Sequence, residues 1–204
     1  MPKDKTETHS RIITAAKKEF MTYGFADASM RRIAADAGIT VSGLYKHFPD
    51  KEAMFASLTE PVISDFFSNY QARETEYFEN AATVDPDEIM SQSRDTVDMM
   101  AYIYDHLDVF QLVLTKSQGT RYETFLHDLA VKEEGSTMEY MRRLRERGIP
   151  MNDFRDAEFH LLVTTYFRAV AEAVIHGFTR EEALHYAETI GRVFRPGMRE
   201  FFGI

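Results

Sequence analysis

The sequence has no cysteine, and it has only 10 glycines and 6 prolines among its 204 residues. The absence of cysteine excludes disulfides, thiolate zinc sites, iron–sulfur clusters and a cysteine nucleophile, and it is compatible with a reducing compartment. Long apolar runs are also missing, because even the stretch from Leu161 to Phe167 is short and interrupted by threonine. We therefore expect no segment to span a bilayer, and the first residues lack the apolar region of a secretory signal. These features predict a cytoplasmic protein without a membrane partner.

The scarce glycines and prolines lie between long segments of mixed polar and apolar residues. No window shows the sustained period-two alternation that is typical of a half-buried strand. The sequence therefore predicts an all-α fold. We expect about nine helices, near residues 8–23, 29–37, 40–47, 50–79, 86–106, 107–117, 120–147, 153–176 and 179–202.

Local signals mark the ends of these helices. Capping boxes at 120–123 and 179–182 predict helix starts, because the hydroxyl and the carboxylate each satisfy an otherwise unpaired backbone N–H. Pro86 stands at the first position of another predicted helix, where its missing N–H costs nothing. The Arg-Pro-Gly triplet at 195–197 is expected to kink or split the last helix. Four glycines follow periodic runs and predict helix ends: Gly24, Gly38, Gly148 and Gly177.

Charge is distributed unevenly along the chain. Residues 1–51 contain nine basic and six acidic residues, a net charge of +3. The remaining residues carry a net charge of −12, so the whole chain has a formal charge of −9. A uniformly basic surface for nucleic acid is thereby excluded, and any contact with phosphates must be local. The asymmetry indicates a small anion-binding head on an acidic body.

Residues 29–48 have the pattern of two short helices joined by a sharp turn. Ile33 and Ala34 share one face of the first helix, which Gly38 ends. Thr40 is placed to cap the second helix. The connection is short enough to force a sharp angle, and we expect the apolar stripe of the preceding helix to pack behind the pair. Two apolar residues supply the wedge between the helices: Ile39 and Leu44.

The outward face of the second helix differs from an ordinary solvated face, which usually mixes both signs of charge. No acidic residue falls between Gly38 and Phe48. The alternative interpretation is a small three-helix bundle that binds no DNA. In such a bundle, Tyr45 is a partly buried core residue and His47 is a capping or packing residue. The face consists of small, hydrogen-bonding or cationic residues: Thr40, Val41, Ser42, Tyr45, Lys46 and His47.

The run IITAAKKEFMTYGFADASMRRIAADAGITVSGLYKHFPDKEAMF resembles the N-terminal DNA-binding domain of the TetR family of bacterial transcription regulators. The resemblance implies a three-helix helix-turn-helix DNA-binding domain at residues 1–50 and a helical ligand-binding and dimerisation domain at residues 51–204. It rests on features in a fixed order and spacing: Ala15-Ala16, Phe20, Gly24-Phe25, Ile33-Ala34, Ala37-Gly38, Leu44-Tyr45-x-His47-Phe48 and Asp50-Lys51-Glu52.

The resemblance also implies that the helix from Thr40 to His47 enters the major groove of double-stranded DNA. Arg31 is the best candidate for a bidentate guanine contact, whereas Val41 suits a thymine methyl group. Arg32 points about 100° away from Arg31 on the helix, so we expect only one of them to touch bases. The resemblance also implies that Ser42 contacts a base edge and that Lys46 contacts either a base or a phosphate. The residues implied to contact phosphates are Ser29, Tyr45, His47 and Lys51.

Gly43 departs from the family pattern, because a threonine, serine or alanine is more usual inside this helix. A glycine at such a position costs about 1 kcal/mol relative to alanine. Two interpretations stay open: the backbone approaches DNA closely at this point, or the helix becomes firm only on binding.

The last two predicted helices carry apolar residues on several faces, so each must be covered on more than one side. In the window 153–176, apolar residues occupy the other sides of a helical stripe that consists of Phe154, Ala157, Leu161, Thr164 or Thr165, Arg168, Ala171 and Ile175. The resemblance implies a homodimer formed by these two helices through an isologous interface. Such a dimer binds two half-sites about 34–36 Å apart, which implies a palindromic operator. A monomer with a large core is the alternative.

The helices between the head and this interface are expected to enclose a small-molecule effector of unknown identity. Methionine and aromatic stripes are more often core than pocket, although adaptable methionine surfaces suit apolar ligands. We expect the ligand to favour a conformation in which the helix starting at residue 50 swings. This change would release repression, which is the commoner mode of regulation in the family. The candidate ligand contacts are Tyr102, His106, Phe110, Gln118, Arg121, Phe125 and Tyr166.

Two other functional classes compete with a regulator. Glu182 and His185 have the Glu-x-x-His spacing of a di-metal helical enzyme, but the sequence has no second Glu-x-x-His. A helical protein–protein interaction module leaves the cationic face from Thr40 to His47 unexplained. We therefore predict no enzyme activity, no catalytic residue, no metal and no cofactor.

Overall fold

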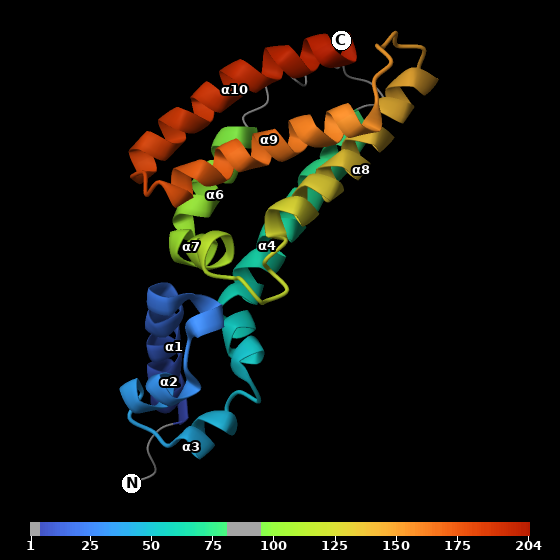
Figure 1. Ribbon diagram of the computed structural model, residues 1–204. Coiled ribbons are helices and arrows are strands. Elements are labelled where there is room, and N and C mark those ends of the chain that lie inside the picture. The colour runs from blue at the N-terminus through green and yellow to red at the C-terminus, as the bar shows by residue number, and fades with distance from the viewer. Residues whose placement is uncertain (1–4, 81–94) are drawn as a thin grey trace. The chain divides into compact units, whose positions relative to one another are not determined.

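The computed structural model describes residues 5–80 and 95–204, and its helices are labelled in Figure 1. All regular structure in these residues is helical, which confirms the predicted fold class, and none of their helices is both long and apolar enough to cross a membrane. Pro86 and the helix start predicted there lie outside the described residues. The helices are α1 (Lys5–Asp27), α2 (Met30–Asp36), α3 (Val41–Tyr45), α4 (Lys51–Asn80), α6 (Asp95–Asp105), α7 (Leu107–Thr115), α8 (Phe125–Glu146), α9 (Asp156–Ile175) and α10 (Arg180–Phe202).

The chain forms two compact units, each with its own internal contacts. The first unit combines Met1–Asp65 with Asp108–Glu123, so it holds α1, α2, α3, the N-terminal half of α4 and most of α7. The second unit combines Phe66–Leu107 with Thr124–Ile204. Helix α4 therefore contributes residues to both units.

The core of the first unit is built from the residues that the helical periodicity selects. Ile12 and Phe20 of α1, Ile33 of α2 and Leu44 of α3 are all completely buried. Ala34 is 1% exposed, and its small side chain allows α2 and α3 to approach closely. This packing fixes α3 against the other two helices, which is the arrangement that the sequence predicts.

Gly24 interrupts α1 with a φ of 73° and a ψ of 168°. A side chain at this φ would be strained, so glycine is the residue that permits the bend. After the bend, the Phe25 N–H donates a hydrogen bond to the Lys116 carbonyl at 2.8 Å. The Phe25 ring stacks on Phe20 and meets Phe55 of α4 edge to face. The other predicted stop glycines also have positive φ: Gly38, Gly148 and Gly177.

Residues 108–123 are tied to the rest of the first unit by charged side chains. Asp108 pairs with Lys17 of α1, and Glu60 of α4 accepts hydrogen bonds from Arg121 and Tyr122. Burial alone would raise the pKa of Asp108, but the hydrogen bond and charge of Lys17 lower it below its usual value. This segment is therefore held by ion pairs as well as by backbone contacts.

The helix start predicted at residue 120 is wrong. The helix expected from residue 120 begins instead at Phe125, and residues 118–124 form turns and a bend. The hydroxyl of Thr120 donates to the Ser117 carbonyl, and the Glu123 carboxylate accepts from the Gly119 N–H at 2.9 Å. The capping side chains thus stabilise a turn. Helix α10 continues through Pro196 and is not split.

In the second unit, one face of α9 is buried against its neighbours. The Tyr104 hydroxyl of α6 donates to the carbonyls of Ala173 and Phe178 at 3.1 and 3.0 Å, which ties α6 to the end of α9. The opposite face of α9 includes Leu161, which is 66% exposed, and Arg168 and Ile175, which are also exposed. The buried residues are Phe159, Val163, Phe167, Val170, Ala171, Ala173 and Val174.

Candidate nucleic-acid interface

The turn between α2 and α3 is held by backbone and capping hydrogen bonds. Gly38 has a φ of 67°, and Ile39 donates its N–H to the Ala34 carbonyl at 3.0 Å. The Thr40 hydroxyl then accepts from the Gly43 N–H at 3.0 Å, which confirms Thr40 as the cap of α3. The helix itself is shorter than the predicted 40–47, because it ends at Tyr45. These contacts fix the direction in which α3 presents its outer residues.

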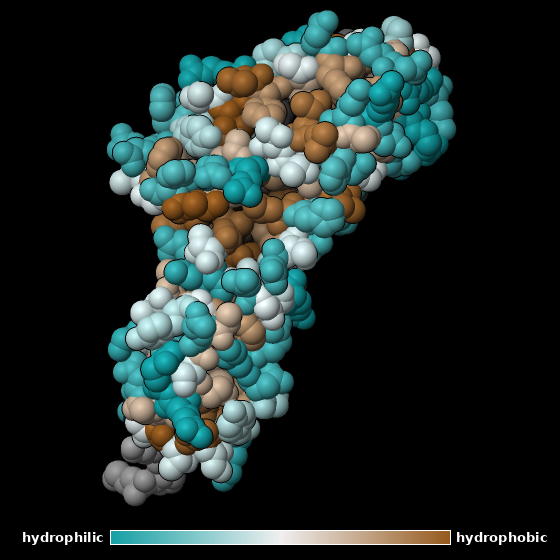
Figure 2. Space-filling view, viewed as in Figure 1, coloured by the Kyte–Doolittle hydropathy of each residue, from teal (hydrophilic) through white to brown (hydrophobic). Residues whose placement is uncertain are grey.

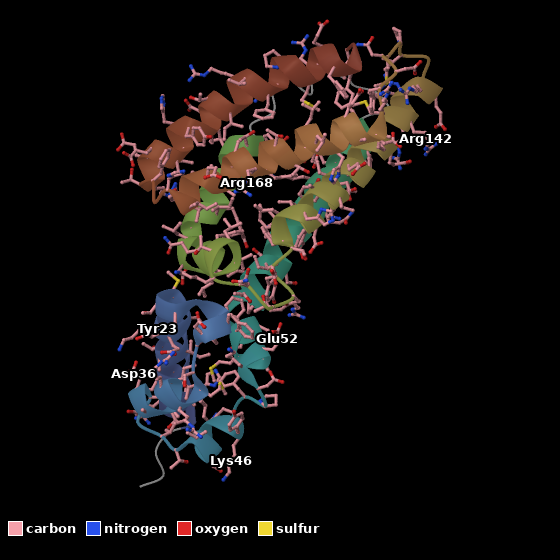
Figure 3. All side chains as sticks on the ribbon, viewed as in Figure 1. Tyr23, Asp36, Lys46, Glu52, Arg142 and Arg168 are labelled. Carbon is pink, nitrogen blue, oxygen red and sulfur yellow. The ribbon has the colours of Figure 1, made fainter. Side chains whose placement is uncertain are left out.

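The outer side of α3 is exposed and carries no acidic side chain. Tyr45 is 48% exposed, so it is not the core residue that the alternative interpretation required. Lys46 lies at the outer edge of α3 in Figure 3 and makes no ion pair with any described residue. Ser42 and His47 are also exposed, whereas Val41 is partly buried. The surface over α2 and α3 in Figure 2 is mainly hydrophilic or intermediate.

The two neighbouring arginines of α2 differ in their partners. Arg32 donates to Glu19 of α1 and to the Asp27 carbonyl, and its guanidinium lies 4.3 Å from the ring centroid of Tyr23. The hydrogen bond to Glu19 raises the pKa of Arg32. Arg31 is exposed and has no ion pair in the described part of the chain. Arg31 is therefore the arginine whose side chain is not held by an ion pair in these residues, and its contact with a base stays a prediction.

Glu19 helps to position α2, a role that the sequence did not predict. Its side chain is only 7% exposed, and besides binding Arg32 it accepts a hydrogen bond from the Ser29 N–H at 2.8 Å. A buried carboxylate is stable only when it is paired. Glu19 thus fixes the start of α2, at the position where Ser29 is predicted to contact a phosphate. No local signal links residues 10 to 13 positions apart.

The Lys51 ammonium already makes hydrogen bonds within the protein. It donates to the carbonyls of Ala26 and Ala28 at 2.9 and 3.3 Å, and it lies 4.5 Å from the ring centroid of Phe25. An ammonium has three N–H donors, so one donor is left for a phosphate. His47 has its ring centroid 6.3 Å from that of His9 in α1.

The position of Gly43 has a local explanation. A Cβ atom added at Gly43 would lie 3.1 Å from the Thr40 hydroxyl oxygen, the atom that caps α3. Such a contact is tighter than normal van der Waals packing, so the capping hydroxyl would have to move. Glycine at position 43 therefore accommodates the Thr40 cap, a reason that differs from both interpretations that the sequence left open.

The candidate ligand contacts fall into both units. In the second unit, the rings of Tyr102 and His106 are 4.7 Å apart, and Phe66 contacts both Tyr102 and Phe125 at 5.8 and 6.0 Å between ring centroids. The Tyr166 hydroxyl is hydrogen-bonded to the Thr96 hydroxyl at 2.8 Å. Three candidates belong to the first unit, where Phe110 is buried, Gln118 is exposed and Arg121 pairs with a glutamate.

The residues of the alternative enzyme site have a different arrangement from a metal centre. Glu182 and Thr179 form the predicted capping box of α10, in which the Glu182 carboxylate accepts from the Thr179 N–H at 2.8 Å. These hydrogen bonds lower the pKa of Glu182. His185 is exposed on the same helix. Among residues 5–80 and 95–204, no group of three or more histidine, aspartate or glutamate side chains is placed to hold a metal ion.

Comparison with known proteins connects this geometry to a family. Residues 12–58, which span α1 to the start of α4, match the family model described as bacterial regulatory proteins of the tetR family. This region is thus similar to the N-terminal region of TetR-family regulators. The match covers the helices that carry the exposed cationic face, and the family named from the sequence is confirmed.

Curated relatives are similar to only part of this chain. The uncharacterized HTH-type transcriptional regulator YdgC of Bacillus subtilis is 42% identical over 62 residues, which are 30% of each chain. The HTH-type transcriptional regulator SAR2658 of Staphylococcus aureus is 28% identical over 122 residues, or 60% of this chain and 62% of that protein. The matched regions thus span less than two thirds of these relatives' lengths.

Solved structures have a similar fold over most of this chain. MexZ of Pseudomonas aeruginosa, described as a key repressor responsible for antibiotic resistance, is 13% identical with a TM-score of 0.56. The alignment covers 95% of this chain and 94% of MexZ. A TetR-like transcriptional regulator from Rhodococcus has a TM-score of 0.52 at 19% identity, with 90% and 93% of the two chains covered. These likenesses establish the fold.

Proposed function

We propose that this chain regulates transcription by placing α3 in the major groove of double-stranded DNA. The observation that carries the proposal is the exposed outer side of α2 and α3, where Arg31 and Lys46 have no ion pair in the described residues and no acid is present on α3. Unpaired cations beside hydroxyl groups attract phosphates and bond to base edges. We assign DNA binding to residues 1–50, and ligand binding and dimerisation to 51–204. A DNA partner implies a cytoplasmic location.

We also propose that the protein acts as a homodimer on a palindromic operator. Leu161 on α9 and Val193 on α10 are each 66% exposed, and Ile175 is 43% exposed. Figure 2 shows apolar side chains gathered over α9 and α10 on the viewed face. Exposed aliphatic residues on two adjacent helices favour a covering partner, and an isologous interface supplies one with the same surface.

The proposed response to a small molecule uses α4. Because α4 contributes residues to both units, a change in its second half is transmitted along one continuous helix to its first half. An effector that prefers one of two conformations shifts the population toward it and releases the operator. MexZ, which shares this fold, is a repressor, and this likeness supports repression here as well.

The alternative of a metal-dependent enzyme at Glu182 and His185 gains no support from the contacts. Glu182 is hydrogen-bonded to Thr179 as a helix cap. A metal analysis of the purified protein separates the two functions, because two bound iron or manganese ions would favour the enzyme.

Selection of bound sequences from randomised DNA duplexes tests the proposal. We expect an inverted repeat whose half-sites lie about 34–36 Å apart. Lys46→Ala should weaken binding, whereas Lys18→Ala is the matched control, because Lys18 is exposed on α1 and pairs with Asp36. Recovery of no preferred sequence, or of a single unrepeated site, would contradict the proposal.

A further inference from the structure

The first unit contains only two of the chain's histidines, and these two lie side by side. His9 is near the start of α1, and His47 follows the end of α3. Their ring centroids are 6.3 Å apart, and the rings are tilted by 46°. Figure 1 shows the start of α1 and α3 at the same end of this unit. His9 therefore lies at the edge of the surface that we propose to bind DNA.

The His9 ring is held in position by Phe48. The two rings are stacked, with centroids 5.7 Å apart and an angle of 27° between their planes. Phe48 is only 6% exposed, whereas His9 and His47 are both exposed. One face of the His9 ring thus rests on the core of the unit, while the side chain stays accessible to a molecule in solvent.

Neither imidazole has a polar partner in the part of the chain that the structure describes. The described histidines with an ion pair are His160 and His176, both in the second unit. The side chains of His9 and His47 make the ring contacts given above and no hydrogen bond among these residues. Both nitrogens of a protonated imidazole are donors. The donors of this pair are therefore open to an anion.

The acidic residues on the surrounding elements have other directions or other partners. Glu7 is two residues from His9, and residues at this spacing do not face each other on a helix. Asp36 of α2 pairs with Lys18 of α1. Asp50 accepts a backbone N–H at the start of α4 at 2.7 Å. We find no carboxylate paired with either imidazole in residues 5–80 and 95–204.

The other charged groups on these elements leave the surface positive. Lys46 directly precedes His47 and has no ion pair in the described residues. Arg11 of α1 donates to a threonine hydroxyl at 3.4 Å. Lys51 and Glu52 at the start of α4 bond to backbone groups of other segments of the unit. Protonation of the two histidines therefore adds positive charge beside unpaired cations, which strengthens the attraction for phosphates.

An imidazole N–H that donates to an oxygen places its ring centroid about 4 Å from that oxygen. Two rings with centroids 6.3 Å apart can therefore both donate to one phosphate group. We propose that His9 is a further DNA-contacting residue, which binds one backbone phosphate together with His47 and does so as the imidazolium ion. This inference rests on the proposed DNA-binding function. It adds α1 to the DNA-binding surface and makes the affinity for DNA depend on pH.

The direction of the pH dependence follows from the charge of the bound form. Histidine changes its charge between about pH 5 and pH 8. A phosphate favours the charged imidazole, so DNA binding takes up protons. The affinity for DNA is therefore greatest when both histidines are protonated. It falls as the pH rises, by at most about tenfold per pH unit for each proton taken up.

Fluorescence anisotropy of the full chain on its selected duplex, at constant ionic strength, tests the proposal at about pH 6 and about pH 8. We expect wild-type binding to weaken by at least about tenfold at the higher pH. His9→Gln should lose about half of this change on a logarithmic scale, because only His47 then takes up a proton. His127→Gln is the matched control, since His127 is exposed on α8 in the second unit, and it should keep the wild-type pH dependence.

His9→Lys separates the charge from its titration, because lysine stays charged at both pH values. This variant should bind DNA more tightly than His9→Gln near the higher pH and should show the same reduced pH dependence. Calorimetric titration in two buffers of different ionisation enthalpy counts the protons, and both variants should take up fewer than wild type.

A His9→Gln variant with the pH dependence and proton uptake of wild type would overturn the inference. Salt-dependent binding of wild type that does not change with pH would overturn it as well, and would leave the DNA-binding proposal standing. Loss of binding at both pH values in wild type would contradict the DNA-binding proposal itself.

Discussion

At the residue scale, Arg31 and Arg32 are neighbours on α2, but only Arg32 has an ion pair within the described residues. The partner of Arg32 is a glutamate that is 7% exposed, so this arginine contributes to the fold. We therefore propose Arg31 as the arginine that recognises a base. The sequence predicts this difference only in part: helix geometry separates the two side chains by about 100°, but it does not say which one meets Glu19.

Substitution of each arginine separates the two roles. Arg31→Ala should relax the preference at one base pair by about 1–3 kcal/mol and leave the melting temperature unchanged. Arg32→Ala should lower the melting temperature, because Glu19 loses its cation, and leave base preference intact. Binding to a set of operator variants and thermal unfolding measure both effects. The interpretation is wrong if Arg31→Ala leaves every base preference as it was.

Lys51→Ala should weaken binding to all DNA sequences alike, because a phosphate contact carries no sequence information. The slope of log affinity against log salt should become less negative by about 0.9, the contribution of one neutralised phosphate. The melting temperature should also fall, since the carbonyls of Ala26 and Ala28 lose their donor. Salt-dependent binding and thermal unfolding of wild type and variant provide the check, and an unchanged slope would argue against the phosphate contact.

At the element scale, α3 depends on one capping hydroxyl. The helix has only five residues, and Thr40 accepts the hydrogen bond of Gly43 at its start. The cap was predictable, because threonine follows a turn at Gly38. The cost of a side chain at Gly43 was not predictable, because it arises from the three-dimensional position of the Thr40 oxygen.

A double-mutant cycle tests this coupling. Thr40→Ala should lower the free energy of unfolding by about 1 kcal/mol through loss of the cap. Gly43→Ala should be more favourable in the Thr40→Ala background than in the wild type, because the hydroxyl that its Cβ would meet is gone. Urea unfolding of all four proteins measures the coupling, which we expect to reach about 0.5 kcal/mol. Additive effects would refute the steric explanation.

The capping boxes show how far local sequence signals reach. The pair Thr179 and Glu182 starts α10 as predicted. The identical spacing at Thr120 and Glu123 stabilises a turn, because both side chains bond to the residues before them, Ser117 and Gly119. A capping motif therefore fixes a local hydrogen-bond pattern, and the surrounding chain decides whether a helix follows.

At the scale of the whole molecule, the account requires a partner on α9 and α10. The period of the sequence identifies one stripe of α9, of which the structure exposes Leu161, Arg168 and Ile175 but buries Ala171. Figure 3 shows Arg168 on α9. What covers these residues stays a prediction, because periodicity distinguishes faces of a helix and does not identify their partners.

Leu161→Glu and Val193→Glu should each convert the dimer into a monomer. Both side chains are 66% exposed, so the stability of the monomer itself should change by less than about 0.5 kcal/mol. Val131→Glu on α8 is the matched control, since Val131 is 49% exposed and lies outside the predicted interface. Sedimentation velocity measures the outcome, and persistence of a dimer in both variants would place the interface elsewhere.

The central claim is that the cationic face of α2 and α3 binds the DNA backbone and reads bases beside it. The most direct measurement is the affinity of the full chain for its selected duplex over a series of salt concentrations. We predict a linear fall of log affinity with log salt, with a slope of about −0.9 for each phosphate neutralised. Affinity that does not change with salt, or no binding at any salt concentration, would contradict the claim.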